Sequence, residues 1–250
     1  MLVLGASFMP LSKMLFREFK DGGWLFSKVL GIAVSGFILW VLVCAGILPF
    51  TSASCIGVVL FCILVNTGIF WYRLKKGKSV FWLTRENGGL ILGEEILFLL
   101  LFLGWTYLSG FHAAAYGTEK FMDYGFMASM MRSQTLPAPD IWYGGEPINY
   151  YYGGQYYAVF LTKLTLTRIQ ETYHVMRTLV AALAFMLPFA LVRQIWEDRV
   201  SGKRKRARAA VPAGVLAGMA VSMAGNMHYV LAGHLLKWFR GFLGHDSDYT

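Results

Sequence analysis

Residues 29–72 read VLGIAVSGFILWVLVCAGILPFTSASCIGVVLFCILVNTGIFWY and contain no charged side chain. A bilayer core of about 30 Å needs roughly 20 apolar residues per helix, so this run is long enough for two spans. Pro49 and the small hydroxyl residues after it interrupt the run near its middle, which is typical of a tight turn. The sequence therefore predicts a helical hairpin, with spans at about 26–48 and 55–72.

Composition places the whole chain in the membrane class. Hydrophobic residues make up 56% of the chain and charged residues 15%, which lies outside the range of soluble globular domains. Further apolar runs predict spans at about 90–111, 174–196 and 210–235. We therefore expect an all-α, polytopic membrane bundle of about five to six transmembrane helices, forming one domain over residues 1–250.

Both ends of the chain read as interrupted elements. The apolar stretch at 1–11 is too short to span a membrane, and it lacks the basic start and small-residue cleavage pattern of a signal peptide. It is expected to be the tail of a longer helix. Because the last residues, GFLGHDSDYT, follow directly on a predicted span, the chain is expected to be the N-terminal part of a longer protein.

Positive charge is distributed unevenly between the segments that connect the predicted spans on the two sides of the membrane. Sixteen of the 23 lysines and arginines fall at 13–28, 73–85 and 193–208. The other seven are Lys120, Arg132, Lys163, Arg168, Arg177, Lys237 and Arg240. This positive-inside bias predicts a cytoplasmic basic loop at 197–208 and an extracytoplasmic loop at 112–173. The KRKRAR run at 203–208 is then a topology anchor beside anionic lipid, so the expected partner is the bilayer and not nucleic acid.

The outer segment is unusual for a connector. Residues 117–163 read GTEKFMDYGFMASMMRSQTLPAPDIWYGGEPINYYYGGQYYAVFLTK and are rich in polar and aromatic side chains. Thr118 can cap a helix that runs to about Ser133, and prolines and glycines then force turns. A second helix, at about 156–166, is too short to cross the membrane. The first helix is expected to lie at the interface or to pack under other helices, and the second to return along or into the outer surface.

Two acidic side chains in the first of these helices are the candidate catalytic groups. Glu119 and Asp123 are four residues apart, so their carboxylates share a helix face. One could accept a proton from a hydroxyl while the other holds a divalent metal or stays protonated. Alternatively, Glu119 serves only the helix start, and Asp123 faces water or pairs with Arg132.

The tyrosine-rich part of the segment is the candidate binding site. Hydroxyls, amides and flat rings beside glycines are the groups that bind sugars. The residues concerned are Asn149, Tyr150, Tyr151, Tyr152 and Gln155. The alternative is that these tyrosines belong to the interfacial aromatic belt of any membrane protein.

Other polar residues could have either a functional role or a simpler structural one. Asp140 and Glu146 could ligate a metal but are typical turn residues. Glu94 and Glu95 lie near a predicted helix start, where acids favour the helix dipole, although a transporter could use them together with His228. His234 is a further intramembrane candidate.

Several classes of site are absent from the sequence. The three cysteines, Cys44, Cys55 and Cys62, fall inside predicted spans and are read as packing residues. No GxSxG, HExxH, P-loop or dinucleotide fingerprint is present. The sequence therefore gives no support for a cofactor of the kind that soluble enzymes bind.

The segments GTEKFMDYGFMASMMRS and LPAPDIWYGGEPINYYYGGQYYAVFLTKLT resemble the YYY membrane protein family of bacteria and archaea, whose function is unknown. The resemblance extends weakly to Gly225, Asn226 and His228. Family members are similar to C-type membrane glycosyltransferases, which use a sugar on a polyprenyl phosphate. The resemblance implies that Asp123 or Glu119 is the catalytic acid and that Arg132 steadies the phosphate.

The implied activity is sugar transfer in assembly of envelope glycans or glycoproteins, with a divalent metal as one option. The alternative is a non-catalytic transporter or assembly protein whose outer loop binds glycan or lipid. The sequence departs from the family pattern at both ends, because members carry a further helix before Met1 and continue beyond Thr250. An intact active site within these residues is therefore only an expectation.

Overall fold

The computed structural model describes residues 1–77, 84–111, 119–200, 209–223, 238 and 241–242. Within these ranges the chain is helical apart from turns and one isolated bridge between Pro139 and Pro147, which confirms the predicted fold class. The chain divides into two compact units, Met1–Ala182 and Leu183–Thr250, which are described separately. Treatment of residues 1–250 as one domain stays a prediction.

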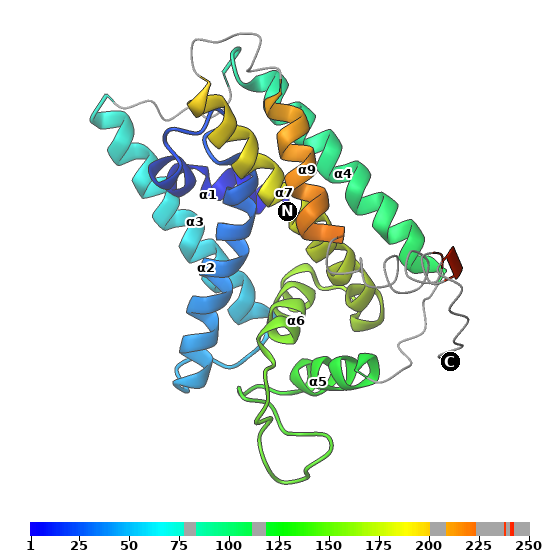
Figure 1. Cartoon of the computed structure of the whole chain (residues 1–250). Helices are drawn as coiled ribbons and strands as arrows, with labels where there is room; N and C mark the ends of the chain where they lie inside the picture. Colours follow the sequence, from blue (N-terminus) through cyan, green and yellow to red (C-terminus); the bar gives the residue numbers. More distant parts are fainter. Residues whose placement is uncertain (78–83, 112–118, 201–208, 224–237, 239–240, 243–250) are drawn as a thin grey trace. The chain divides into compact units, whose positions relative to one another are not determined.

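The helices follow the predicted order (Figure 1). They are α1 (Leu2–Leu15), α2 (Trp24–Cys44), α3 (Ser52–Lys75), α4 (Gly88–Gly110), α5 (Lys120–Arg132), α6 (Gly153–Thr165), α7 (Ile169–Arg199) and α9 (Ala210–Met223). Among the described residues four helices, α2, α3, α4 and α7, are long and apolar enough to cross a membrane. The predicted span at 210–235 is described only as far as Met223, and its remainder lies outside the described residues.

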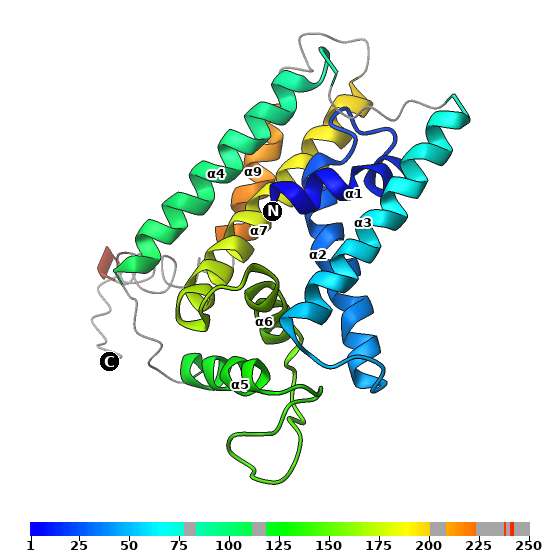
Figure 2. The same cartoon turned by 180° about the vertical axis from the view of Figure 1, so that it is seen from behind.

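The predicted hairpin is present as α2 and α3. Both views show these helices side by side, joined by a short turn (Figures 1 and 2). Gly46 adopts a left-handed backbone with φ of 70°, which ends the helix four residues earlier than expected. Thr51 caps α3, because its hydroxyl accepts a hydrogen bond from the Ser54 amide at 3.2 Å.

Residues 119–168 fold as a cap on the turn end of this hairpin. The Phe50 amide donates to the Gln134 carbonyl at 2.8 Å, so the turn is bound to the chain just after α5. Tyr156 of α6 donates from its hydroxyl to the Gly36 carbonyl of α2 at 2.7 Å. Figures 1 and 2 both show α5 and α6 at this end of the hairpin. Helix α6 is thus hydrogen-bonded to α2, and the chain just after α5 is hydrogen-bonded to the hairpin turn.

Lys163 is the buried centre of the cap. Its ammonium donates to the Phe50 carbonyl and, at 3.2 Å, to the Ser133 carbonyl, and it stands 3.9 Å from the centre of the Phe50 ring. Burial lowers the pKa of Lys163 from 10.5 to about 8. One side chain therefore joins the hairpin turn, the end of α5 and α6.

The titration of Lys163 gives a stability prediction. The pKa of Lys163 is about 8 in the folded protein, compared with 10.5 for an ordinary lysine. Burial of the charged side chain therefore lowers the stability of the fold at pH values below 8, and this loss of stability disappears as the pH rises from 8 to 10.5. We expect the difference in unfolding free energy between the wild type and Lys163→Met to grow in that window by up to about 3 kcal/mol. Thermal unfolding in detergent at several pH values measures it, and a difference that stays constant would contradict the assignment.

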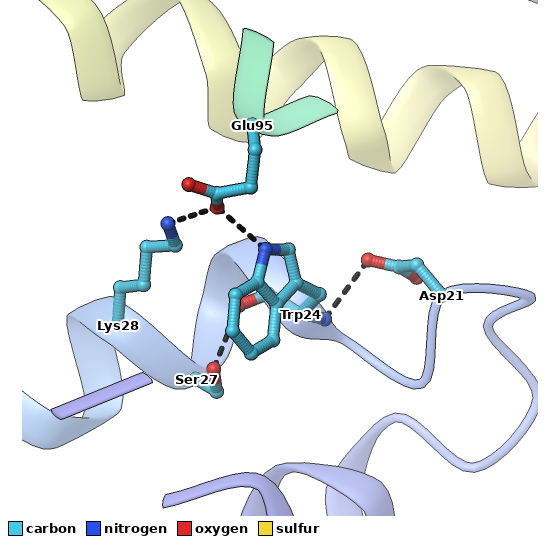
Figure 3. A network of polar contacts seen from close by, with 5 residues as sticks. All are labelled: Asp21, Trp24, Ser27, Lys28 and Glu95. Carbon is cyan, nitrogen blue, oxygen red and sulfur yellow. Dashed lines mark hydrogen bonds and ion pairs between the residues drawn. The ribbon is translucent and has the colours of Figure 1, made fainter. Parts of the chain in front are cut away.

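Glu94 and Glu95 do not lie at a helix start, so their expected role at the helix dipole was wrong. The first turn of α4 contains no acidic residue, because the helix begins at Gly88 and these two glutamates follow almost two turns later. Glu95 instead forms an ion pair with Lys28, whose side chain is fully buried (Figure 3). The indole nitrogen of Trp24 also donates to the same carboxylate oxygen at 2.6 Å. Glu95 is therefore held by an ion pair with a residue distant in the sequence, and not by the dipole of its own helix.

In the second unit, the C-terminal part of α7 and α9 pack at close range. A Cβ atom built on Gly214 would lie 2.7 Å from the Phe189 carbonyl oxygen, and one on Gly218 would lie 2.8 Å from that of Phe185. Glycines spaced four apart let two helix backbones approach in a membrane. Gly214 and Gly218 of α9 thus allow this close packing against α7.

Gly218→Ala is expected to destabilise the protein by about 1–3 kcal/mol, because the new methyl group would overlap the Phe185 carbonyl, which is backbone and cannot rotate away. Gly104→Ala is the matched control, since nothing lies within 4 Å of a Cβ at that position. The control should be neutral or stabilise the helix by up to about 1 kcal/mol. Thermal unfolding in detergent measures both, and equal effects would contradict the packing argument.

Candidate functional site

A pocket of about 430 Å³ lies between α5, α6 and the beginning of α7. Its polar lining includes Asp123, Gln155, Tyr173 and Arg177, and its apolar lining includes Met127, Met176 and Val180. All these residues belong to the first unit. The pocket therefore combines a carboxylate, an amide, a phenol and a guanidinium with an apolar wall.

Asp123 is fixed by a contact across the chain. It lies in the first turn of α5, where its amide donates to the Glu119 carbonyl at 2.9 Å. Its Oδ1 accepts a hydrogen bond from Nε2 of Gln155 at 2.6 Å. Gln155 lies in the first turn of α6, which the glycines at 153 and 154 begin. The carboxylate is thus oriented by a neutral donor and retains the capacity to accept a proton.

The opposite wall comes from α7. Arg177 places its guanidinium 5.6 Å from the centre of the Tyr173 ring, which is a cation–π distance. Tyr173 is buried, and its ring meets that of Tyr124 edge to face at 5.8 Å. The aromatic pair supports Arg177, whose own side chain is exposed. A cation is therefore available in the same pocket as the Asp123 carboxylate.

Tyr150 and Tyr151 do not line the pocket, but Tyr151 interacts electrostatically with Asp123. The rings of Tyr150 and Tyr151 lie 4.0 Å apart at 34°, and both are exposed. The pKa of Tyr151 is raised to about 12, chiefly by a hydrogen bond with Tyr150, and the carboxylates of Glu119 and Asp123 add to the effect. The Tyr151 hydroxyl thus interacts electrostatically with both candidate acids. Glu119 is exposed at the start of α5.

Three predicted residues lie elsewhere. Arg132 ends α5, nine residues after Asp123 and so about 13 Å along the helix, and it is exposed. Asn149 is exposed in the loop before α6, and the Tyr152 hydroxyl accepts a hydrogen bond from Nε1 of Trp40 at 3.1 Å. None of the three lines the pocket. Their roles in binding stay predictions.

Asp140 is a turn residue in the structure. Its Oδ1 accepts hydrogen bonds from the amides of Trp142 at 2.8 Å and Tyr143 at 3.2 Å, and its own amide donates to the Glu146 carbonyl at 2.8 Å. Within the described ranges, no group of three or more His, Cys, Asp or Glu side chains could hold a metal ion. Metal binding by Glu119 and Asp123 stays a prediction.

Arg177 was not among the predicted site residues, although the sequence contained a signal for it. The residue falls inside the predicted span at 174–196, where an arginine is costly and marks a functional position by default. From the sequence, Arg177 was considered only as one of the seven lysines and arginines outside the three basic segments. Its proximity to the Asp123 pocket depends on how α7 packs, which no local pattern encodes.

Part of the predicted pattern cannot be located. Gly117, Thr118, the basic run at 203–208, Gly225, Asn226, His228 and His234 lie outside the described residues. The three cysteines are described, and all are free thiols. Cys55 and Cys62 are buried, which agrees with a packing role, whereas Cys44 is exposed at the end of α2.

Comparison with known proteins matches the chain to a protein family. A family model described as "Uncharacterized membrane protein (DUF2298)" matches residues 34–244. No curated protein and no solved structure matches the chain. The matched range includes every residue that lines the pocket between α5, α6 and α7.

Proposed function

Because the chain belongs to the DUF2298 family of uncharacterised membrane proteins, we propose its function from the chemistry of the pocket. The protein is a multi-pass membrane protein that lies in a lipid bilayer. We propose that it is a C-type glycosyltransferase, which moves a sugar from a polyprenyl-phosphate donor to an acceptor hydroxyl in assembly of cell-envelope glycans or glycoproteins.

The observation that carries the proposal is that Asp123 and Arg177 line the same pocket. A lipid-linked sugar has an anionic phosphate, a polyhydroxylated ring and an apolar chain. Arg177 suits the phosphate, because a guanidinium can form two parallel charge-assisted hydrogen bonds with it. The apolar side chains of Met176 and Val180 suit the beginning of the chain.

The proposed reaction uses Asp123 as general base. Its carboxylate accepts the proton of the acceptor hydroxyl while the hydroxyl oxygen forms a bond to the anomeric carbon. The bond between that carbon and the phosphate oxygen breaks, and the polyprenyl phosphate leaves with the electron pair. Arg177 stabilises the charge of the leaving phosphate. Glu119 is the weaker candidate for the base, because it is exposed and does not line the pocket.

The tyrosines are proposed to bind the sugar ring. Tyr150 and Tyr151 present exposed rings near the two carboxylates, and stacking on such rings suits the apolar face of a sugar. Gln155 orients Asp123 and offers its amide oxygen to sugar hydroxyls. The aromatic-belt alternative assigns the same tyrosines to the membrane interface.

We also propose that the 112–173 loop is extracytoplasmic and the 197–208 loop cytoplasmic. The cap of α5 and α6 lies at the turn end of the hairpin, and Arg73 and Lys75 lie at the opposite end of α3. This separation supports the positive-inside orientation. A cysteine placed at Tyr143, which is 70% exposed, should react with a membrane-impermeant maleimide on intact cells.

The direct test is turnover by the purified protein in proteoliposomes. A panel of radiolabelled polyprenyl-phosphate hexoses is supplied with water as the minimal acceptor, and free hexose and polyprenyl phosphate are measured. Release of both in equal amounts is expected from one donor of the panel. Binding of a donor without release would favour the non-catalytic alternative, in which the outer loop binds glycan or lipid for transport or assembly. A folded protein that neither binds nor cleaves any donor would overturn both.

A further inference from the structure

Tyr173 is a buried polar residue of the pocket to which the proposed reaction gives no role. It lies on α7, is 4% exposed and lines the Asp123 pocket. Among the described residues, none forms a hydrogen bond with its hydroxyl. Tyr156, which is 2% exposed, shows the usual arrangement, because its hydroxyl donates to the Gly36 carbonyl at 2.7 Å. Tyr173 therefore differs from a tyrosine whose hydroxyl serves the fold.

The contacts of Tyr173 within the protein involve its ring and not its hydroxyl. The ring meets that of Tyr124 edge to face at 5.8 Å, and the Arg177 guanidinium stands 5.6 Å from its centre. A phenylalanine ring could make both contacts. A buried hydroxyl, by contrast, lowers the stability of the fold unless it finds a hydrogen-bond partner. A ligand in the pocket that accepts a hydrogen bond would supply this partner.

The neighbours of Tyr173 indicate the chemistry of that ligand. Arg177 follows Tyr173 by four residues on α7, so the two side chains share a helix face. The Tyr173 phenol interacts electrostatically with both Arg177 and Asp123. Asp123 accepts its hydrogen bond from Gln155 instead. A phenol donor beside a guanidinium suits an anionic oxygen, and a phosphate has several oxygens that can accept from both groups.

We propose that the Tyr173 hydroxyl donates a hydrogen bond to the phosphate of the lipid-linked sugar, beside the Arg177 guanidinium. This inference rests on the proposed function, which supplies the identity of the ligand. Before the donor binds, water that enters the pocket can pair with the hydroxyl. A phosphate oxygen replaces such a water without loss of the hydrogen bond.

The same contact would assist the transfer step, and Tyr173 keeps its proton throughout. When the bond between the anomeric carbon and the phosphate oxygen breaks, the electron pair stays on the phosphate. The negative charge on the phosphate oxygens therefore increases, and the hydrogen bond from the phenol becomes stronger. Tyr173 would thus contribute both to donor affinity and to departure of the polyprenyl phosphate.

The test is titration of the full chain in detergent with undecaprenyl phosphate. Tyr173→Phe should weaken binding by about ten- to a hundredfold, which is the effect of one hydrogen bond to a charged group. Tyr124→Phe is the matched control, because it removes the hydroxyl of the other ring of the aromatic pair, which does not line the pocket. It should bind within about twofold of the wild type. Undecaprenol, which lacks the phosphate, should bind equally to all three proteins.

Thermal unfolding separates a ligand contact from a structural role. Without ligand, Tyr173→Phe should have a Tm at least as high as that of the wild type, because it removes a buried hydroxyl and keeps the ring. A lower Tm would assign the hydroxyl to the fold and contradict the proposal. Added undecaprenyl phosphate should raise the Tm of the wild type and of Tyr124→Phe more than that of Tyr173→Phe.

The binding results also distinguish this inference from the proposed reaction. The inference is overturned if Tyr173→Phe binds undecaprenyl phosphate like the wild type, if Tyr124→Phe loses as much affinity, or if undecaprenol binding falls equally. Binding that depends on Tyr173, without release of hexose from any donor, would support the phosphate contact and reject the transfer. Release of hexose by Tyr173→Phe with wild-type rate and affinity would support the transfer and reject the contact.

Discussion

Asp123→Asn is expected to lower sugar transfer by on the order of 10²–10⁴-fold, because the amide cannot accept the proton of the acceptor hydroxyl. The fold should be unaffected, since the asparagine oxygen can still accept the hydrogen bond that Gln155 donates to Asp123 at 2.6 Å. Initial rates with the polyprenyl-phosphate hexose that the wild type cleaves provide the measurement. Donor affinity should change by less than about threefold, because the lost charge does not contact the phosphate.

Asp140→Asn is the matched control for this experiment. Asp140 lies in the same outer segment and accepts two backbone hydrogen bonds, which an asparagine oxygen can also accept. It does not line the pocket, so turnover should stay within about twofold of the wild type. If Asp123→Asn retained full turnover while Glu119→Gln lost it, Glu119 would be the base. Full turnover in both variants would remove the general-base mechanism.

Arg177→Met is expected to weaken binding of the donor by about ten- to a hundredfold. A hydrogen bond to a charged group contributes about 1.5–3 kcal/mol, and each 1.4 kcal/mol is a factor of ten in affinity. Arg177 is exposed, so its loss should leave the fold intact. Titration of the purified protein with undecaprenyl phosphate measures the effect without requiring turnover. The weakening should decrease at high salt, because exposed charges are screened.

Arg132→Met is the control for Arg177→Met, and it also tests the sequence-based prediction directly. Both arginines are exposed, but only Arg177 lines the pocket. Undecaprenyl phosphate should bind Arg132→Met like the wild type. If Arg132→Met lost affinity and Arg177→Met did not, the phosphate would lie at the end of α5, as the family resemblance implied. Arg177→Lys should recover only part of the affinity, because a lysine cannot form the paired hydrogen bonds of a guanidinium.

The amino-acid sequence by itself determined the helical membrane class and the main helices. These features depend on composition and on residues that are close together in the chain, so they can be read from the sequence. Examples are the charge-free run at 29–72, the turn after Pro49 and the short helix before Leu166. The bounds differed by a few residues because ends depend on local geometry, as at Gly46. Asp123 and Gln155 were also identified as candidates from residue type and spacing.

Only the tertiary structure decided which of these groups lie together. Asp123 meets Gln155 across 32 residues, and Arg177 of α7 lines the same pocket although it was not among the predicted site residues. Glu95 was assigned to a helix dipole because its neighbours suggested a helix start, yet its partner Lys28 lies 67 residues away. Helical periodicity fixes which face a residue occupies, but not which helix packs against that face. The pairing of helices depends on close contacts between distant segments, and these determine where the charges of this protein meet.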